Sequence, residues 1–150
     1  MRFNFLKKLQ KLQKDRRGNL YVETIVKLLL MATVLILTIH IFAMVLQYQH
    51  VVYSAKAIAK VVEQNGEYGS EAKDMLIQLN DNFKANMKME ISDVTYFDSS
   101  GKIQFRDSFV ISVSDVYTLP IITPYGKKGV NIEVPMKSDV VGISEVYWKE

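Results

Sequence analysis

Residues 18–46 read GNLYVETIVKLLLMATVLILTIHIFAMVL, and this stretch decides how the rest of the chain can be arranged. From residue 28 onward the run is apolar except for Thr33, Thr38 and His40. A helix rises about 1.5 Å per residue, so residues 28–46 cover close to the ~30 Å thickness of a bilayer's hydrocarbon core. Insertion of the Leu, Ile, Val and Phe side chains offsets one central His and two hydroxyls, so we expect this segment to cross a membrane once.

The residues before this run are strongly basic. Residues 1–18 hold seven Lys and Arg residues against one Asp, whereas the whole chain has a net charge of +3, so the remainder is net negative. Lys and Arg gather on the cytoplasmic side of membrane spans. We therefore predict a cytoplasmic N-terminus, with Arg16, Arg17 and Lys27 as the charges that set the topology. The basic charge belongs to a leader beside a membrane span, which argues against binding to nucleic acid.

The composition also limits the chemistry. The chain has no cysteine, which excludes disulfides, thiolate metal sites and cysteine nucleophiles. It contains no nucleophile elbow, phosphate-binding loop or metal-ligand cluster. We expect no enzymatic activity and no cofactor, and the part outside the membrane must be held together by its own apolar core.

Helical spacing continues beyond the apolar run. No helix breaker occurs over residues 20–64, so we predict one uninterrupted helix with an amphipathic outer half. The inward face of that half consists of residues at helical spacing: Val51, Ala55, Ile58 and Val62. Residues 65–69, NGEYG, end the helix. A second helix is predicted to begin with Ser70 as its N-cap and to end near residue 86.

From residue 87 onward the apolar period changes to two, and β-branched and aromatic residues become frequent, which is typical of strands. We predict strands at residues 89–97, within 103–119, around 130–136 and at 140–148, with turns at 98–101 and 123–126. In the third strand, Val130, Ile132, Val134 and Met136 alternate with polar residues and Pro135, so one face is expected to be buried. Pro135 favours an edge position for this strand, because proline cannot donate to a sheet ladder.

These elements predict an α+β fold with three regions. Residues 1–18 form a basic cytoplasmic leader, residues 19–46 form the membrane-entry and transmembrane helix, and residues 47–150 form an extracytoplasmic domain. In that domain an antiparallel sheet is expected to pack on the amphipathic half of the long helix.

One motif at the mouth of the span is typical of a known family. Gly18 follows the basic leader, and Glu23 stands five residues later, directly before the hydrophobic helix. A carboxylate at the edge of a membrane is costly and needs a reason to be there. In this motif and in its general layout the chain resembles the type IV pilin superfamily, and it is most similar to TadE-like pseudopilins of tight-adherence systems.

The resemblance implies a processing site and an assembly residue. A prepilin peptidase would cut between Gly18 and Asn19, and Glu23 would pair with the new α-amino group of a neighbouring subunit. The implied partners are membrane lipid, that peptidase, other pilin-like subunits and a membrane assembly platform, and the implied location is the bacterial cytoplasmic membrane. The chain lacks the cysteine-bounded loop of many major pilins, which favours a minor or pseudopilin role.

Other interpretations of the same residues stay open. Glu23 and Lys27 have the i, i+4 spacing of a helix-surface ion pair, worth only ~0.2 to 0.5 kcal/mol. The leucines at 6, 9 and 12 fit an amphipathic helix on the membrane surface. The protein could then be an unprocessed single-pass accessory protein whose outer domain binds a partner. A domain released by ordinary signal peptidase is a further alternative, although the apolar run is long for a signal peptide.

Overall fold

The computed structural model describes residues 16–98, 100–122 and 130–149, with the side chains of residues 16–19, 121 and 122 outside the described set. The basic leader before residue 16 and the predicted turn at 123–126 therefore lie outside the described residues. The chain divides into an N-terminal unit, Met1–Phe42, and a C-terminal unit, Ala43–Glu150. The fold class is α+β, as predicted: the described residues form two helices, α2 and α3, and a three-stranded antiparallel sheet.

Helix α2 runs from Arg16 to Asn65 without interruption, which confirms the predicted long helix. It already includes the four residues before the predicted start, Gly18 among them, and these are the first residues that the structure describes. At the other end Gly66 adopts a left-handed conformation with a φ of 63°, and its N–H donates to the carbonyl of Val62 at 2.9 Å. Glycine tolerates this conformation at no steric cost, so the helix stops there.

Helix α3 runs from Ser70 to Phe83. The predicted N-cap is wrong by one residue: Gly69 occupies that position, and no side chain caps the helix. The helix also ends earlier than predicted, because Lys84 adopts a left-handed conformation with a φ of 53°. Asn80 then directs the chain toward the sheet, since its side-chain amide both accepts from the N–H of Met87 at 2.8 Å and donates to its carbonyl at 3.0 Å.

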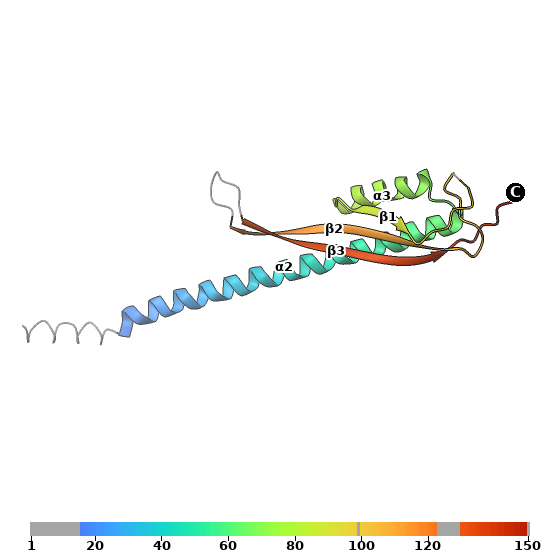
Figure 1. The fold of residues 1–150 in the computed structure, drawn as a ribbon. Helices are drawn as coiled ribbons and strands as arrows, with labels where there is room; N and C mark the ends of the chain where they lie inside the picture. The colour runs from blue at the N-terminus through green and yellow to red at the C-terminus, as the bar shows by residue number, and fades with distance from the viewer. Residues whose placement is uncertain (1–15, 99, 123–129, 150) are drawn as a thin grey trace, which may run out of the picture. The chain divides into compact units, whose positions relative to one another are not determined.

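The sheet has the order β1-β2-β3, with β1 at Lys88–Ser92, β2 at Ser108–Ile122 and β3 at Val130–Ile143 (Figure 1). Both neighbouring pairs are antiparallel, and Met89 lies opposite Val113 while Phe109 lies opposite Gly142. Strand β3 is at an edge, which confirms the position predicted from Pro135.

Two strand predictions need correction. The first strand ends at Ser92 rather than residue 97, because Asp93 has a φ of 49° that leaves the extended conformation. The predicted last strand at 140–148 is wrong: its first part is the end of β3, and no strand is assigned to residues 144–149. The N–H of Glu145 instead donates to the carbonyl of Glu63 on α2.

One core joins α2, α3 and the sheet within the C-terminal unit. It contains the predicted helix face, two α3 residues and side chains from β2 and β3: Val51, Ala55, Ile58, Val62, Ala72, Leu79, Phe109, Ile111, Val113 and Met136. The sheet therefore packs on the amphipathic half of α2, as predicted. The prediction that one face of the third strand is buried is confirmed only in part, because Met136 is buried while Val130 and Ile132 are exposed.

Candidate functional site

The predicted processing site lies on α2, among the first residues that the structure describes. The backbone of Arg16, Arg17, Gly18 and Asn19 is helical, but the side chains of these residues lie outside the described set. The structure therefore places the Gly18–Asn19 peptide bond on the helix, and the roles predicted for the two arginines stay predictions.

Glu23 and Lys27 are brought together one helical turn further on. The Lys27 Nζ atom lies 2.7 Å from Glu23 Oε1, and both side chains are more than half exposed. This is the i, i+4 pair that the sequence spacing indicates. The carboxylate that the pilin resemblance assigns to assembly thus has a partner on its own helix.

The apolar part of α2 exposes its side chains. This helix is long and apolar enough to cross a membrane, and none of the residues in its most apolar part is buried within the structure. The threonine hydroxyls are satisfied locally, because Thr33 donates to the carbonyl of Leu29 at 2.9 Å and Thr38 donates to that of Val34 at 2.8 Å. Such bonds lower the cost of a hydroxyl in hydrocarbon. The long apolar helix is compatible with a single-pass membrane protein.

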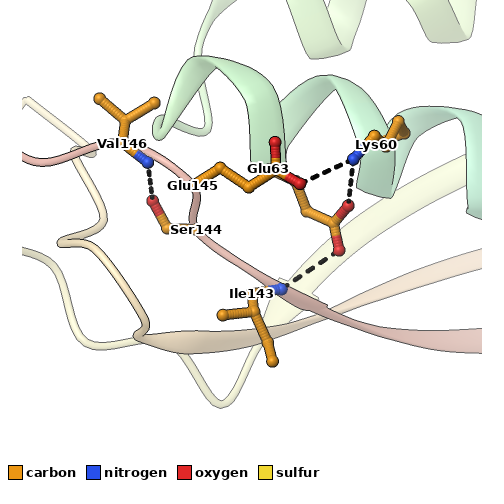
Figure 2. Close-up of polar contacts among 6 residues, drawn as sticks. All are labelled: Lys60, Glu63, Ile143, Ser144, Glu145 and Val146. Atoms are coloured by element: carbon orange, nitrogen blue, oxygen red, sulfur yellow. Dashed lines mark hydrogen bonds and ion pairs between the residues drawn. The ribbon is translucent and has the colours of Figure 1, made fainter.

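A second polar cluster, absent from the predictions, joins α2 to the segment after β3. We call Lys60, Glu63 and Glu145 the latch (Figure 2). The Lys60 Nζ atom lies 2.9 Å from Glu145 Oε1 and 3.3 Å from Glu63 Oε2. The hydrogen bonds that Lys60 donates to the carboxylates of Glu145 and then Glu63 raise the pKa of Lys60 above its ordinary value. The spacing of Lys60 and Glu63 fits a helix pair, but no sequence signal points to Glu145, which is 85 positions from Lys60.

Trp148, near the end of the chain, contacts the residue that follows α2. The Nε1 atom of Trp148 donates to the carbonyl of Gly66 at 3.2 Å. The Gln104 side chain accepts from the backbone N–H of Trp148 at 2.9 Å and donates to its carbonyl at 3.0 Å. Trp148 is half-buried, so its indole acts as part of the core boundary, whereas the neighbouring Tyr147 is exposed.

Among the described residues, no group of three or more His, Asp or Glu side chains is placed to hold a metal ion. The latch and the Trp148 contacts hold the segment after β3 against α2.

Comparison with known proteins identifies the family of this chain. Residues 28–149 match a domain family described as a domain of unknown function, DUF4320. The chain belongs to the DUF4320 family. Comparison with curated proteins and with solved structures finds no match.

The limits of the DUF4320 match bear on the candidate sites. The matched region contains the apolar run, the part of α2 that lies in the C-terminal unit, α3 and the three strands. It begins one residue after Lys27, so Gly18, Glu23 and Lys27 lie before it. The latch of this DUF4320 chain lies inside it.

Proposed function

We propose that this chain is a pilin-like structural subunit of the pseudopilin type, acting in a bacterial pilus, secretion or conjugation apparatus. The observation that carries the proposal is the placement of Glu23, five residues after Gly18 and shortly before the apolar run of α2, whose large apolar side chains are exposed. In this proposal a prepilin peptidase cuts after Gly18, and the helix packs among other pilin-like subunits on a membrane assembly platform.

The topology of the proposal follows from charge. The basic leader stays on the cytoplasmic side of the bacterial membrane, α2 crosses the bilayer once, and the C-terminal unit lies outside the cytoplasm. The role is structural rather than catalytic.

Glu23 has a specific task in this proposal. Cleavage would give Asn19 a new α-amino group, and Glu23 of an adjacent subunit would pair with it. A buried ion pair is favourable only when its geometry is good, so the pairing would also select one register between subunits. Lys27, 2.7 Å from Glu23 within the same helix, would compete with that amino group for the carboxylate.

A second candidate function rests on the same ion pair. Because Glu23 already has a partner in Lys27, its presence at the membrane edge is explained without assembly. The chain would then be an unprocessed single-pass accessory protein whose C-terminal unit binds a partner outside the cytoplasm.

Matched substitutions separate the two candidates. Glu23→Gln removes the charge but keeps the size of the side chain, and Lys27→Gln does the same for its partner. Both variants would be expressed with the rest of the apparatus, and the fraction of the chain in large complexes would be measured after mild detergent extraction, relative to the amount in the membrane.

The pilin-like proposal predicts that Glu23→Gln lowers the assembled fraction and that Lys27→Gln leaves it unchanged or raises it. Equal assembled fractions for wild type and both variants would refute the role of Glu23 and favour the accessory protein.

A further inference from the structure

Residues 116–120 of β2 and 130–135 of β3 form a two-stranded ribbon. It is the part of the β2–β3 hairpin that extends beyond the residues paired with β1. Strand β1 pairs only with residues Val110 to Ser114 of β2, so no third strand continues beside the ribbon in the described part of the chain. Two-stranded hairpins are marginally stable in water unless another surface covers them. The part of the ribbon beyond its contact with α2 therefore favours a covering surface.

The ribbon is also unusually apolar for an exposed element. None of its described side chains is buried, and Val116, Val130 and Ile132 are 48%, 61% and 47% exposed. Among its described residues Glu133 alone carries a charge. The apolar residues lie on both faces: Val130 and Ile132 share the face of Met136, while Val116 lies on the other. A fluid apolar environment can cover both faces, whereas a single protein groove covers one.

Two contacts within the C-terminal unit fix the direction of the ribbon. At one end, residues 134–137 of β3 line a cavity with Met44, Val45 and Tyr48 of α2. At the other end, Ile143 of β3 donates its N–H to Glu63 of α2. Strand and helix each cover about 25 Å between these points, so they run side by side in the same direction.

The ribbon consequently extends toward the end at which α2 enters this unit. From Val134 to Val130 the strand advances about 13 Å further in that direction. Met44 is itself near the end of the apolar run of residues 28–46. Tyr48 and Lys137, which line the cavity, are residue types that favour the boundary between bilayer and water.

We propose that this ribbon is a membrane-contacting element, whose apolar side chains lie at the boundary of headgroups and acyl chains in the bilayer that α2 crosses. The inference requires α2 to span a membrane, but it does not require cleavage after Gly18 or assembly through Glu23. The ribbon would fix the distance and orientation of the C-terminal unit relative to the lipid surface.

Single-cysteine labelling tests this inference, since the chain has no native cysteine. The full chain would be reconstituted in vesicles of phosphatidylcholine and phosphatidylglycerol, with a polarity-sensitive fluorophore at Ile132→Cys or Val116→Cys on the two faces of the ribbon. Ser108→Cys, exposed at the opposite end of β2, is the aqueous control, and Leu35→Cys is the control for the span. Val130→Cys replaces Ile132→Cys if that variant does not fold, as judged by Trp148 fluorescence.

Lipid contact predicts blue-shifted emission from both ribbon labels, quenching by doxyl-labelled lipid and loss of most quenching by aqueous iodide relative to the Ser108 label. Iodide quenching equal to that of the Ser108 label would overturn the inference. Shielding of the Ile132 label from both quenchers, with the Val116 label open to iodide, would also overturn it and indicate protein on one face. A Leu35 label outside lipid would refute the span and the inference together, whereas a Leu35 label in lipid with ribbon labels in water refutes the inference alone.

Discussion

The carboxylate of Glu63 accepts a hydrogen bond from the backbone N–H of Ile143, 3.2 Å away, at the open edge of β3 (Figure 2). The next N–H along, that of Ser144, donates to the carbonyl of Asp107 directly before β2. Successive N–H groups of an antiparallel strand point to opposite sides, so the N–H of Ile143 points away from the sheet. Unpaired edge donors invite pairing with other chains. Glu63 therefore covers the edge of β3 where the chain leaves the sheet.

Removing this cover should destabilise the C-terminal unit. We expect Glu63→Ala to lower its free energy of unfolding by about 1 kcal/mol, because a hydrogen bond to the strand edge is lost. Fluorescence of Trp148, the single tryptophan, reports the unfolding transition of the full chain in detergent. Glu145→Ala is the control: it removes an exposed ion pair and should have a much smaller effect. If both variants lowered the free energy of unfolding equally, the hydrogen bond from Ile143 to Glu63 would contribute no stability of its own.

Two buried serines should respond to alanine with opposite signs. The hydroxyl of Ser54 on α2 is buried and has no hydrogen-bond partner among the described residues. Ser54→Ala should raise the free energy of unfolding by about 1 kcal/mol, since alanine has no hydroxyl to desolvate and favours the helix. Ser144→Ala should lower it by about 1 to 3 kcal/mol, because Ser144 donates to the buried carbonyl of Ile103 at 2.9 Å. Urea unfolding followed at Trp148 measures both changes, and a loss of stability in Ser54→Ala would mean that its hydroxyl has a partner in solution.

Gly142 should not tolerate a side chain. A Cβ atom at this position would lie 2.4 Å from Cζ of Phe109, the cross-strand neighbour whose ring is fully buried. We expect Gly142→Ala to cost about 1 to 3 kcal/mol through overpacking, seen as a lower melting temperature. Gly69→Ala is the matched control, because the atom nearest its Cβ is the mobile end of the Glu67 side chain. Similar melting temperatures for Gly142→Ala and wild type would mean that Phe109 can move aside.

Protonation of Asp139 at low pH should lower the stability of the C-terminal unit. A hydrogen bond from Ser112, 2.6 Å away, and then one from Lys137 lower the pKa of Asp139 below its ordinary 3.8. A carboxylate whose pKa is lower in the folded than in the unfolded protein stabilises the folded state at pH values above its unfolded-state pKa. That contribution is lost as the pH falls through its folded-state pKa. Asp98, whose pKa is lowered by Ser100 and then Lys102, acts in the same direction.

The melting temperature should therefore fall as the pH drops from about 5 to 3, and Ser112→Ala should make this fall shallower because it removes the largest cause of the Asp139 shift. Ser108→Ala, at an exposed position of the same strand, controls for the loss of a strand serine in general. An unchanged slope in Ser112→Ala would mean that the Ser112 bond does not distinguish the folded from the unfolded state.

The elements set by local patterns were predictable. The span of α2 follows from its lack of helix breakers and the left-handed glycine at position 66, and the edge position of β3 follows from the missing N–H of Pro135. The Glu23–Lys27 pair was likewise expected, because an i, i+4 spacing brings two side chains together on any helix. In the helix and in the ion pair the neighbours in sequence are also the neighbours in space.

Features set by tertiary contacts were not predictable. The first strand was expected to continue past Ser92, but Asp93 adopts a left-handed conformation that its sequence neighbours do not require. The segment after Ile143 has strand-like composition, yet its backbone bonds to α2 instead. The latch was missed because α3 and the whole sheet separate Lys60 from Glu145 in the sequence.

The N-terminal sequence and intact mass of the chain, purified from bacterial membranes with and without a cognate prepilin peptidase, test the central claim most directly. The pilin-like account predicts a new N-terminus at Asn19 that depends on the peptidase and disappears in Gly18→Val. A chain that retains Met1 in every sample, while the same peptidase cleaves a known prepilin substrate, would contradict that account and leave a permanently anchored accessory protein.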